Sequence, residues 1–292
     1  MVLDEEAQVD SVAEISLQKQ AQIIQRIEAI ATTLHTSSLL CDALRVIVEH
    51  FDLDSVLPDP VYETAIANIG PLIVGYGLGS FCDSSNAVHQ LAFLVALRKA
   101  LGHILATRNA HVLKGFQSFH LDTEIFDPVM NKADVAIATH FKLKIIQENE
   151  HGKRQVFPCN QTIFFMPHCG KALYQNVLAC NWGLQLHHVV IIGNSFTAYA
   201  DRVLARVERE QLLLVRVLPY VNETALSCGV ARTHDDFRHY EAAFNDLSVH
   251  AFRPFHALHN EKHDNAFKTA FVGELENSHI ISSITPIASQ RM

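Results

Sequence analysis

The segment 162-TIFFMPHCGKALYQNVLACNWGLQLHHVVIIGNSF-196 decides the fold class. Residues 162–166 form an apolar run typical of a buried strand, residues 171–182 have a helical pattern, and residues 187–196 return to a strand pattern. Pro167 ends the first strand, because proline cannot donate a hydrogen bond to a neighbouring strand. Two apolar runs joined by a helix predict a βαβ unit, whose strands are parallel.

The same alternation continues on both sides of this unit. The predicted strands are residues 71–81, 123–129, 143–150, 162–166, 187–196 and 246–252. The predicted helices lie within residues 5–50, 84–107, 132–141, 171–182 and 197–211. Residues 212–220 fit either a sixth strand in chain order or a helix that runs into a loop. The repeated strand–helix alternation favours a mainly parallel sheet.

The predicted strands are apolar at successive positions, which is expected when helices cover both faces of a sheet. We therefore predict an α/β fold: a Rossmann-like doubly wound, mainly parallel sheet with helices on both faces and an N-terminal helical extension. The expected divisions are a helical extension at 1–60, an α/β domain at 61–255 and a loop or tail at 256–292.

The composition excludes several classes of protein. The chain has 292 residues, 49% hydrophobic and 18% charged, which is typical of a folded domain with a large core. A net charge of −8 argues against direct nucleic-acid binding, which needs a basic surface. No apolar run reaches the roughly 18–20 residues of a membrane span, and the acidic N-terminal residues do not resemble a signal peptide. The six cysteines form no CxxC pair, so we expect free thiols and a reducing compartment.

Chemically capable residues follow five of the predicted strands. In parallel sheets the ligand crevice lies beyond the carboxyl ends of the strands, so these residues are expected to share one edge. The third predicted strand ends in Glu148, Asn149 and Glu150. The candidate ligand-binding residues are Gly75, Gly77, Gly79, Ser80, Asp127, His168, Cys169, Asn194 and Ser195.

The glycine loop, Gly75 to Ser80, departs from both nucleotide fingerprints. A dinucleotide loop reads G-x-G-x-x-G, but Ser80 occupies the third glycine position. An acidic residue is expected about 20 residues later, and Asp127 comes much later than that. The G-x-G-x-G spacing is similar to that of methyl-donor-dependent methyltransferases, although no acid directly precedes the loop. Anion binding at the following helix and simple close packing both remain open.

His168 and Cys169 lie where a strand passes into a helix. We expect the first amides of that helix to lower the pKa of Cys169, and Asp127 and Asn194 to orient His168. A structural turn, with His168 bonded to nearby backbone, is the alternative. No zinc spacing is present, and His168 or Cys169 as a haem ligand remains an alternative without support from a Cys-Pro dipeptide.

Several motifs together resemble the Sensitivity to Red light Reduced family, the SRR-like domain. The stretches VGYGLGSF, HQLAFLVAL, IFDPV, QTIFFMPHCGKALYQNVLACNW and VVIIGNSF occur in this order, between about residues 70 and 200. The matching positions are Gly75, Tyr76, Gly77, Gly79, Ser80, Gln90, Leu91, Asp127, Pro128, Pro167, His168, Cys169, Leu173, Tyr174, Asn181, Trp182, Gly193, Asn194, Ser195 and Phe196.

The resemblance implies a regulatory protein, connected with circadian rhythms and with control of haem biosynthesis. It implies a cytoplasmic and also nuclear location, and action through protein partners or a small ligand. It implies no reaction and no defined cofactor. The alternatives are an enzyme that uses a nucleotide or an S-adenosylmethionine-like cofactor at the glycine loop, and a haem-binding sensor.

Overall fold

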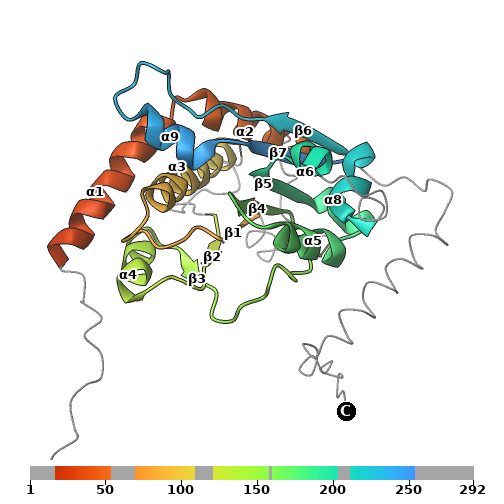
Figure 1. Cartoon of the computed structure of the whole chain (residues 1–292), viewed down its shortest axis with the longest axis horizontal. Coiled ribbons are helices and arrows are strands. Elements are labelled where there is room, and N and C mark those ends of the chain that lie inside the picture. Colours follow the sequence, from red (N-terminus) through yellow and green to blue (C-terminus); the bar gives the residue numbers. More distant parts are fainter. Residues whose placement is uncertain (1–16, 54–69, 109–120, 158–159, 203–210, 254–292) are drawn as a thin grey trace, which may run out of the picture.

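Seven strands form one sheet in a computed structural model, which describes residues 17–53, 70–108, 121–157, 160–202 and 211–253 (Figure 1). Their spatial order is β3-β2-β1-β4-β5-β7-β6. The strands are β1 (Leu72–Tyr76), β2 (Thr123–Phe126), β3 (Lys144–Ile145), β4 (Thr162–Met166), β5 (Val189–Asn194), β6 (Val221–Ala225) and β7 (Leu247–Phe252). The α-helices are α1 (Leu17–Leu34), α2 (Ser38–His50), α3 (Ser85–Arg108), α4 (Lys132–His140), α5 (Lys171–Cys180), α6 (Phe196–Arg202), α8 (Leu213–Arg216) and α9 (Phe237–Phe244).

The first five strands are all parallel, which confirms the predicted α/β fold with a mainly parallel sheet. The strand β7 is antiparallel to both β5 and β6. The segment 226–246, which contains α9, begins after β6 and returns the chain to the same edge of the sheet. Because the chain re-enters the sheet at the edge it left, β7 must run in the opposite direction to β6.

Helices cover both faces of the sheet, and each face has its own apolar core (Figure 1). Neighbouring residues of a strand point to opposite faces, so Ile73 joins one core and Val74 the other. All five residues of β4 are buried, which explains its uninterrupted apolar sequence. Burial of each large aliphatic side chain contributes about 1.5–3 kcal/mol before conformational entropy is counted.

The N-terminal helices α1 and α2 belong to the core on the α3 side. Ile27 and Leu34 are fully buried there, in the same cluster as residues of α3 and the sheet. The Ser37 hydroxyl caps α2 by accepting a hydrogen bond from the Leu40 amide at 3.2 Å. Within the described ranges, no helix has the length and apolar character needed to cross a membrane.

One local prediction was wrong. The predicted strand 143–150 pairs only at Lys144 and Ile145, after which the chain turns so that Glu150 can reach Arg154 and Tyr76. For residues 212–220 the structure confirms the helical alternative: α8 is followed by a 3₁₀ turn, Leu218–Tyr220.

The strand β6 and the helix α9 were not predicted. The residues of β6, VNETA, are partly exposed at the edge of the sheet and lack an apolar run. Helix α9 has only eight residues, and its buried residues Tyr240, Ala243 and Phe244 repeat at helical spacing, a signal that the sequence reasoning did not use. The expected tail at 256–292 lies outside the described residues.

Candidate functional site at the carboxyl edge of the sheet

The loops that follow β1, β2, β4 and β5 all lie at one edge of the sheet, because these strands are parallel neighbours. Gly77 and His168 are exposed there, and Asp127, Asn194 and Ser195 are partly exposed. The predicted convergence of these loops is therefore confirmed, whereas binding of a ligand to them stays a prediction. Gly75 is the exception in position, because it lies buried within β1 against Ile125.

The glycine loop is held by the end of β2. Gly77 and Gly79 have φ angles of 71° and 80°, a left-handed region that favours glycine. The Gly77 amide donates to the Phe126 carbonyl at 3.1 Å, and the Gly79 amide donates to Asp127 Oδ2 at 2.7 Å. The other carboxylate oxygen of Asp127 accepts from the Val129 amide at 2.9 Å. Asp127 thus connects the two loops at the edge.

Ser80 and Ser195 make local contacts at the ends of their loops. The Ser80 hydroxyl donates to Asp83 Oδ2 at 3.0 Å and is itself buried. The Ser195 hydroxyl accepts from the Ala198 amide at 3.0 Å, which caps the first turn of α6. Both serines therefore stabilise the loops on which the other candidate residues lie.

Asn194 holds the turn between β4 and α5. Its Oδ1 atom accepts a hydrogen bond from the His168 amide at 2.7 Å, and its own amide donates to the Tyr174 hydroxyl at 2.8 Å. Its side-chain nitrogen donates to the Tyr199 hydroxyl at 3.3 Å, and Tyr199 donates to the Cys169 carbonyl at 2.8 Å. These contacts support a strained turn, since His168 has a φ of 55°.

The expectation that Asp127 and Asn194 orient His168 by hydrogen bonding holds only for Asn194, and only at the backbone of His168. Asn194 contacts the backbone of His168, and Asp127 contacts the glycine loop instead. The ring Nε2 lies 3.0 Å from the Ala243 carbonyl, near the end of α9. The Gln90 side chain donates to the same carbonyl at 3.2 Å. His168 therefore joins the turn after β4 to α9, which agrees with the alternative of a backbone-bonded histidine.

The expectation that the helix lowers the pKa of Cys169 was also wrong. Burial of the thiol, together with the nearby negative charge of Asp127, raises the pKa of Cys169 to about 12. The Sγ atom lies 3.4 Å from the Tyr76 carbonyl, and it lies 2.5 Å from where a Cβ at Gly77 would be. Because the nucleophilic form is the thiolate, Cys169 in this environment is a packed, unreactive thiol.

The residues at this junction do not fit a haem or metal ligand set. A thiolate ligand would have to be formed from the buried Cys169, and the His168 ring already lies against Ala243. In the part of the chain that the structure describes, no group of three His, Cys, Asp or Glu side chains is arranged to hold a metal ion. Cys159, His256, His259 and His263 lie outside that part.

An ion network under the end of β1 was missed by the sequence reasoning. The Arg154 guanidinium donates to Glu124 at 2.6 Å and to Glu150 at 2.7 Å, and only 18% of its side chain is exposed. The Tyr76 hydroxyl donates to Glu150, and burial with this contact raises the pKa of Tyr76 above its ordinary value. The acidic end of the predicted third strand was the available signal, but its partner Arg154 is recognisable only in three dimensions.

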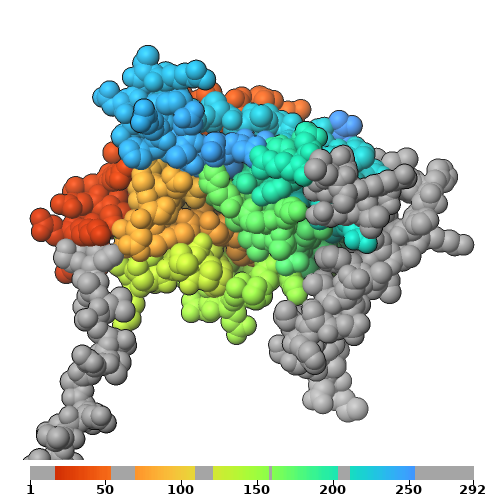
Figure 2. Space-filling model, viewed as in Figure 1, coloured from red at the N-terminus to blue at the C-terminus, as the bar shows by residue number. Residues whose placement is uncertain are grey.

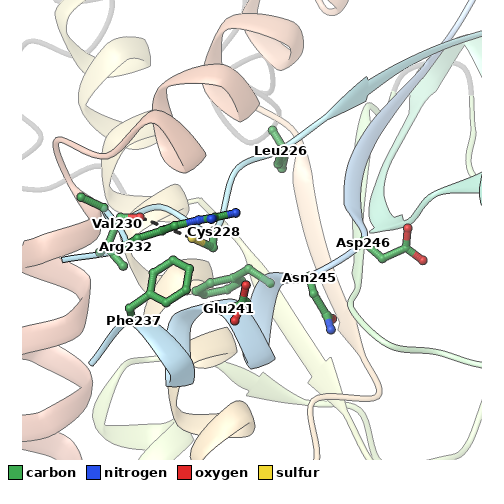
Figure 3. Close-up of a pocket in the computed structure, with 10 residues that line it drawn as sticks. Leu226, Cys228, Val230, Arg232, Phe237, Glu241, Asn245 and Asp246 are labelled. Carbon is green, nitrogen blue, oxygen red and sulfur yellow. Dashed lines mark hydrogen bonds between the residues drawn. The ribbon is translucent and has the colours of Figure 1, made fainter. Parts of the chain in front are cut away.

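A cavity of about 500 Å³ lies at the same edge, beside β6 and β7 (Figure 3). Its lining combines apolar residues with charged and amide groups: Leu226, Cys228, Val230, Ala231, Arg232, Phe237, Glu241, Phe244, Asn245 and Asp246. None of the nine candidate residues lines it. The cavity and the candidate residues are neighbours, since the Ser195 amide donates to the Asp246 carbonyl at 3.0 Å.

Comparison with known proteins identifies the family. The SRR1 domain model matches residues 44–251, more than half of the chain and nearly all of the sheet. The chain belongs to the SRR1 family. This confirms the resemblance drawn from the motifs.

Three SRR1 relatives are similar over long segments. The mouse SRR1-like protein is 35% identical over 160 residues, which cover 54% of this chain and 58% of the mouse protein. The Arabidopsis protein SENSITIVITY TO RED LIGHT REDUCED 1 is 25% identical over 240 residues, covering 82% of this chain and 78% of the plant protein. The Drosophila SRR1-like protein is 30% identical over 182 residues, covering 62% of this chain and 54% of the Drosophila protein. The matched region spans little more than half of the two animal relatives.

Proposed function

We propose that this SRR1 protein regulates circadian rhythms and haem biosynthesis through a ligand or partner site at the carboxyl edge of the sheet. The observation that carries the proposal is the convergence of four loops into one polar, partly exposed surface. The Arabidopsis relative is named for reduced sensitivity to red light, and a role in timing is consistent with that name. The proposed location is the cytoplasm and the nucleus, and the proposed partners are proteins or a small molecule.

We also propose that the sheet carrying this site has a Rossmann-like, doubly wound arrangement. The order β3-β2-β1-β4-β5 reverses direction between β1 and β4, and ligands in such sheets bind at the point of reversal. Gly77 follows β1 and Cys169 follows β4, so the candidate residues lie on both sides of this point. A fold-level likeness supports the location of a site but names no function by itself.

In the experiment that tests this proposal, the cell's own protein is replaced by the His168→Asn variant. Asparagine tolerates the left-handed backbone at this position, so the variant removes the ring with little added backbone strain. The matched control is His103→Asn. His103 is exposed and lies in α3, about 27 Å along the helix from its first residue, Ser85. The proposal expects His168→Asn to lose the rhythm of a clock reporter and the normal haem content, while His103→Asn restores both. Full restoration of both by folded His168→Asn would contradict it.

A further inference from the structure

We infer that the glycine loop and Asp127 bind a phosphate-free adenosyl compound, of the S-adenosylmethionine or S-adenosylhomocysteine type. The inference rests on the proposed function, since it names a ligand for the same edge of the sheet. It concerns binding and is independent of whether the bound compound is a signal or a methyl donor.

The first support is the position of the loop in the sheet. The loop follows β1, next to the point where the strand order reverses between β1 and β4. An antiparallel strand, β7, lies between β5 and β6.

The second support is the exposed backbone of the loop. Gly77 is exposed, and Gly79 is partly exposed, so the main chain meets solvent without side chains in front of it. Cys169 fills the space on one side of Gly77, and a Cβ added there would lie 2.5 Å from its sulfur. A ligand at Gly77 must therefore lie on the side of the loop away from Cys169.

The third support is the charge of Asp127 inside the loop, which selects the type of ligand. In a dinucleotide site the loop amides are free to bind a pyrophosphate. Here the Gly79 amide donates to Asp127 Oδ2 at 2.7 Å, so a phosphate at this position would meet a carboxylate. Like charges at such short range repel each other, which disfavours dinucleotides and ATP.

Ribose hydroxyls, in contrast, are suitable partners for the same carboxylate. Asp127 directly follows β2, the position at which an acid accepts hydrogen bonds from a ribose in related sheets. Each of its oxygens accepts one backbone hydrogen bond, and a carboxylate oxygen has a second lone pair. The sulfonium cation of S-adenosylmethionine is also compatible with a negative loop.

The alternative explanation is that Asp127 has only a structural role and holds the glycine loop in its conformation. It accepts from the Val129 amide two residues later, which is a common turn motif, and it accepts from Gly79. Both explanations predict a folded loop, so the distinction requires a binding measurement on variants that keep the fold.

The experiment is titration calorimetry of the full chain with S-adenosylhomocysteine, S-adenosylmethionine, ATP and NAD. We expect the two adenosyl compounds to bind, and ATP and NAD to bind at least tenfold more weakly. Asp127→Asn should weaken S-adenosylhomocysteine binding at least tenfold. The matched control Asp122→Asn changes an exposed acid just before β2, at the opposite edge of the sheet, and should bind normally.

A second measurement uses the unchanged protein, in case Asp127→Asn fails to fold. S-adenosylhomocysteine should slow hydrogen exchange of the Gly77 and Gly79 amides, while the exposed end of β6 stays unaffected. No binding of either adenosyl compound, equal or tighter binding of NAD, or normal binding by Asp127→Asn would each overturn the inference. The proposed regulatory function would survive these results, because its own test depends on His168 in cells.

Discussion

Replacement of Gly193 by alanine should destabilise the protein strongly, although the change adds one methyl group. Gly193 lies in β5, between β4 and β7 in the sheet. A Cβ at this position would lie 2.5 Å from the hydroxyl oxygen of Tyr174, 2.7 Å from its Cε1 and 3.0 Å from its Cζ. The tyrosine cannot simply move aside, because it is fully buried and packs against Phe196 and Tyr199.

The magnitude follows from two separate costs. Overpacking of a filled core costs about 1–3 kcal/mol. Displacement of the ring also weakens two hydrogen bonds, one from Tyr174 to the Met166 carbonyl and one from the Asn194 amide to Tyr174, at about 1 kcal/mol each. The sum is about 3–5 kcal/mol, a large part of the 5–15 kcal/mol that stabilises a typical domain.

Urea unfolding followed by circular dichroism measures this loss. Gly75→Ala should cost less than Gly193→Ala, because its nearest contact would be 3.1 Å, and Gly170→Ala should cost least, because nothing lies within 4 Å. Tyr174→Phe combined with Gly193→Ala should recover part of the loss, since it removes the atom closest to the new methyl group. A cost for Gly193→Ala below about 0.5 kcal/mol, or no recovery in the double variant, would refute the reasoning.

Three further predictions concern thiol reactivity, buried charge and pH. Cys169 should stay unmodified by a thiol reagent at pH 8, while the exposed Cys41 reacts. Peptide mass spectrometry measures the labelling of each cysteine, and equal labelling of both would contradict the raised pKa of Cys169. Arg154→Ala should cost about 3–5 kcal/mol of unfolding free energy, because it removes the ion-pair partner of Glu124 and leaves Glu150 with only the Tyr76 hydroxyl. Lys144→Ala at an exposed ion pair should cost less than about 1 kcal/mol, and similar costs of the two variants in urea unfolding would show that the Arg154 network contributes little. Burial lowers the pKa of His250 from 6.5 to about 4, so the unfolded state takes up a proton at a higher pH than the folded state does. The free energy of unfolding should therefore fall as the pH drops from about 6.5 toward 4. In His250→Phe the slope of the unfolding free energy against pH should be smaller by about one proton, and an unchanged slope would contradict the prediction.

The position of the candidate site was predictable from the sequence, whereas its contacts were not. Polar residues follow strands whose apolar runs are easily recognised, and parallel strands bring their carboxyl ends to one edge. The partners of these residues come from distant parts of the chain. Ala243, the partner of the His168 ring, is 75 positions away, in a short helix that the sequence reasoning did not predict.

The reactivity of Cys169 shows the same difference. Its place just before a helix suggests a lowered pKa, because helix amides favour a negative charge. The folded chain buries the thiol between the glycine loop and the Tyr76 carbonyl, and the cost of removing a thiolate from water outweighs the helix. The burial of a residue depends on which segments pack around it in the fold, and it cannot be predicted from the adjacent residues in the sequence.

The sequence by itself determined the family, the α/β class and the parallel central strands. Apolar runs and helix periodicity express local backbone preferences and burial, which act at short range along the chain. Only the tertiary structure decided the antiparallel direction of β7, the association of α1 and α2 with the core, and the link from His168 to α9. The physical reason is that these features depend on contacts between segments far apart in sequence, which form only when the sheet and both helical layers are assembled.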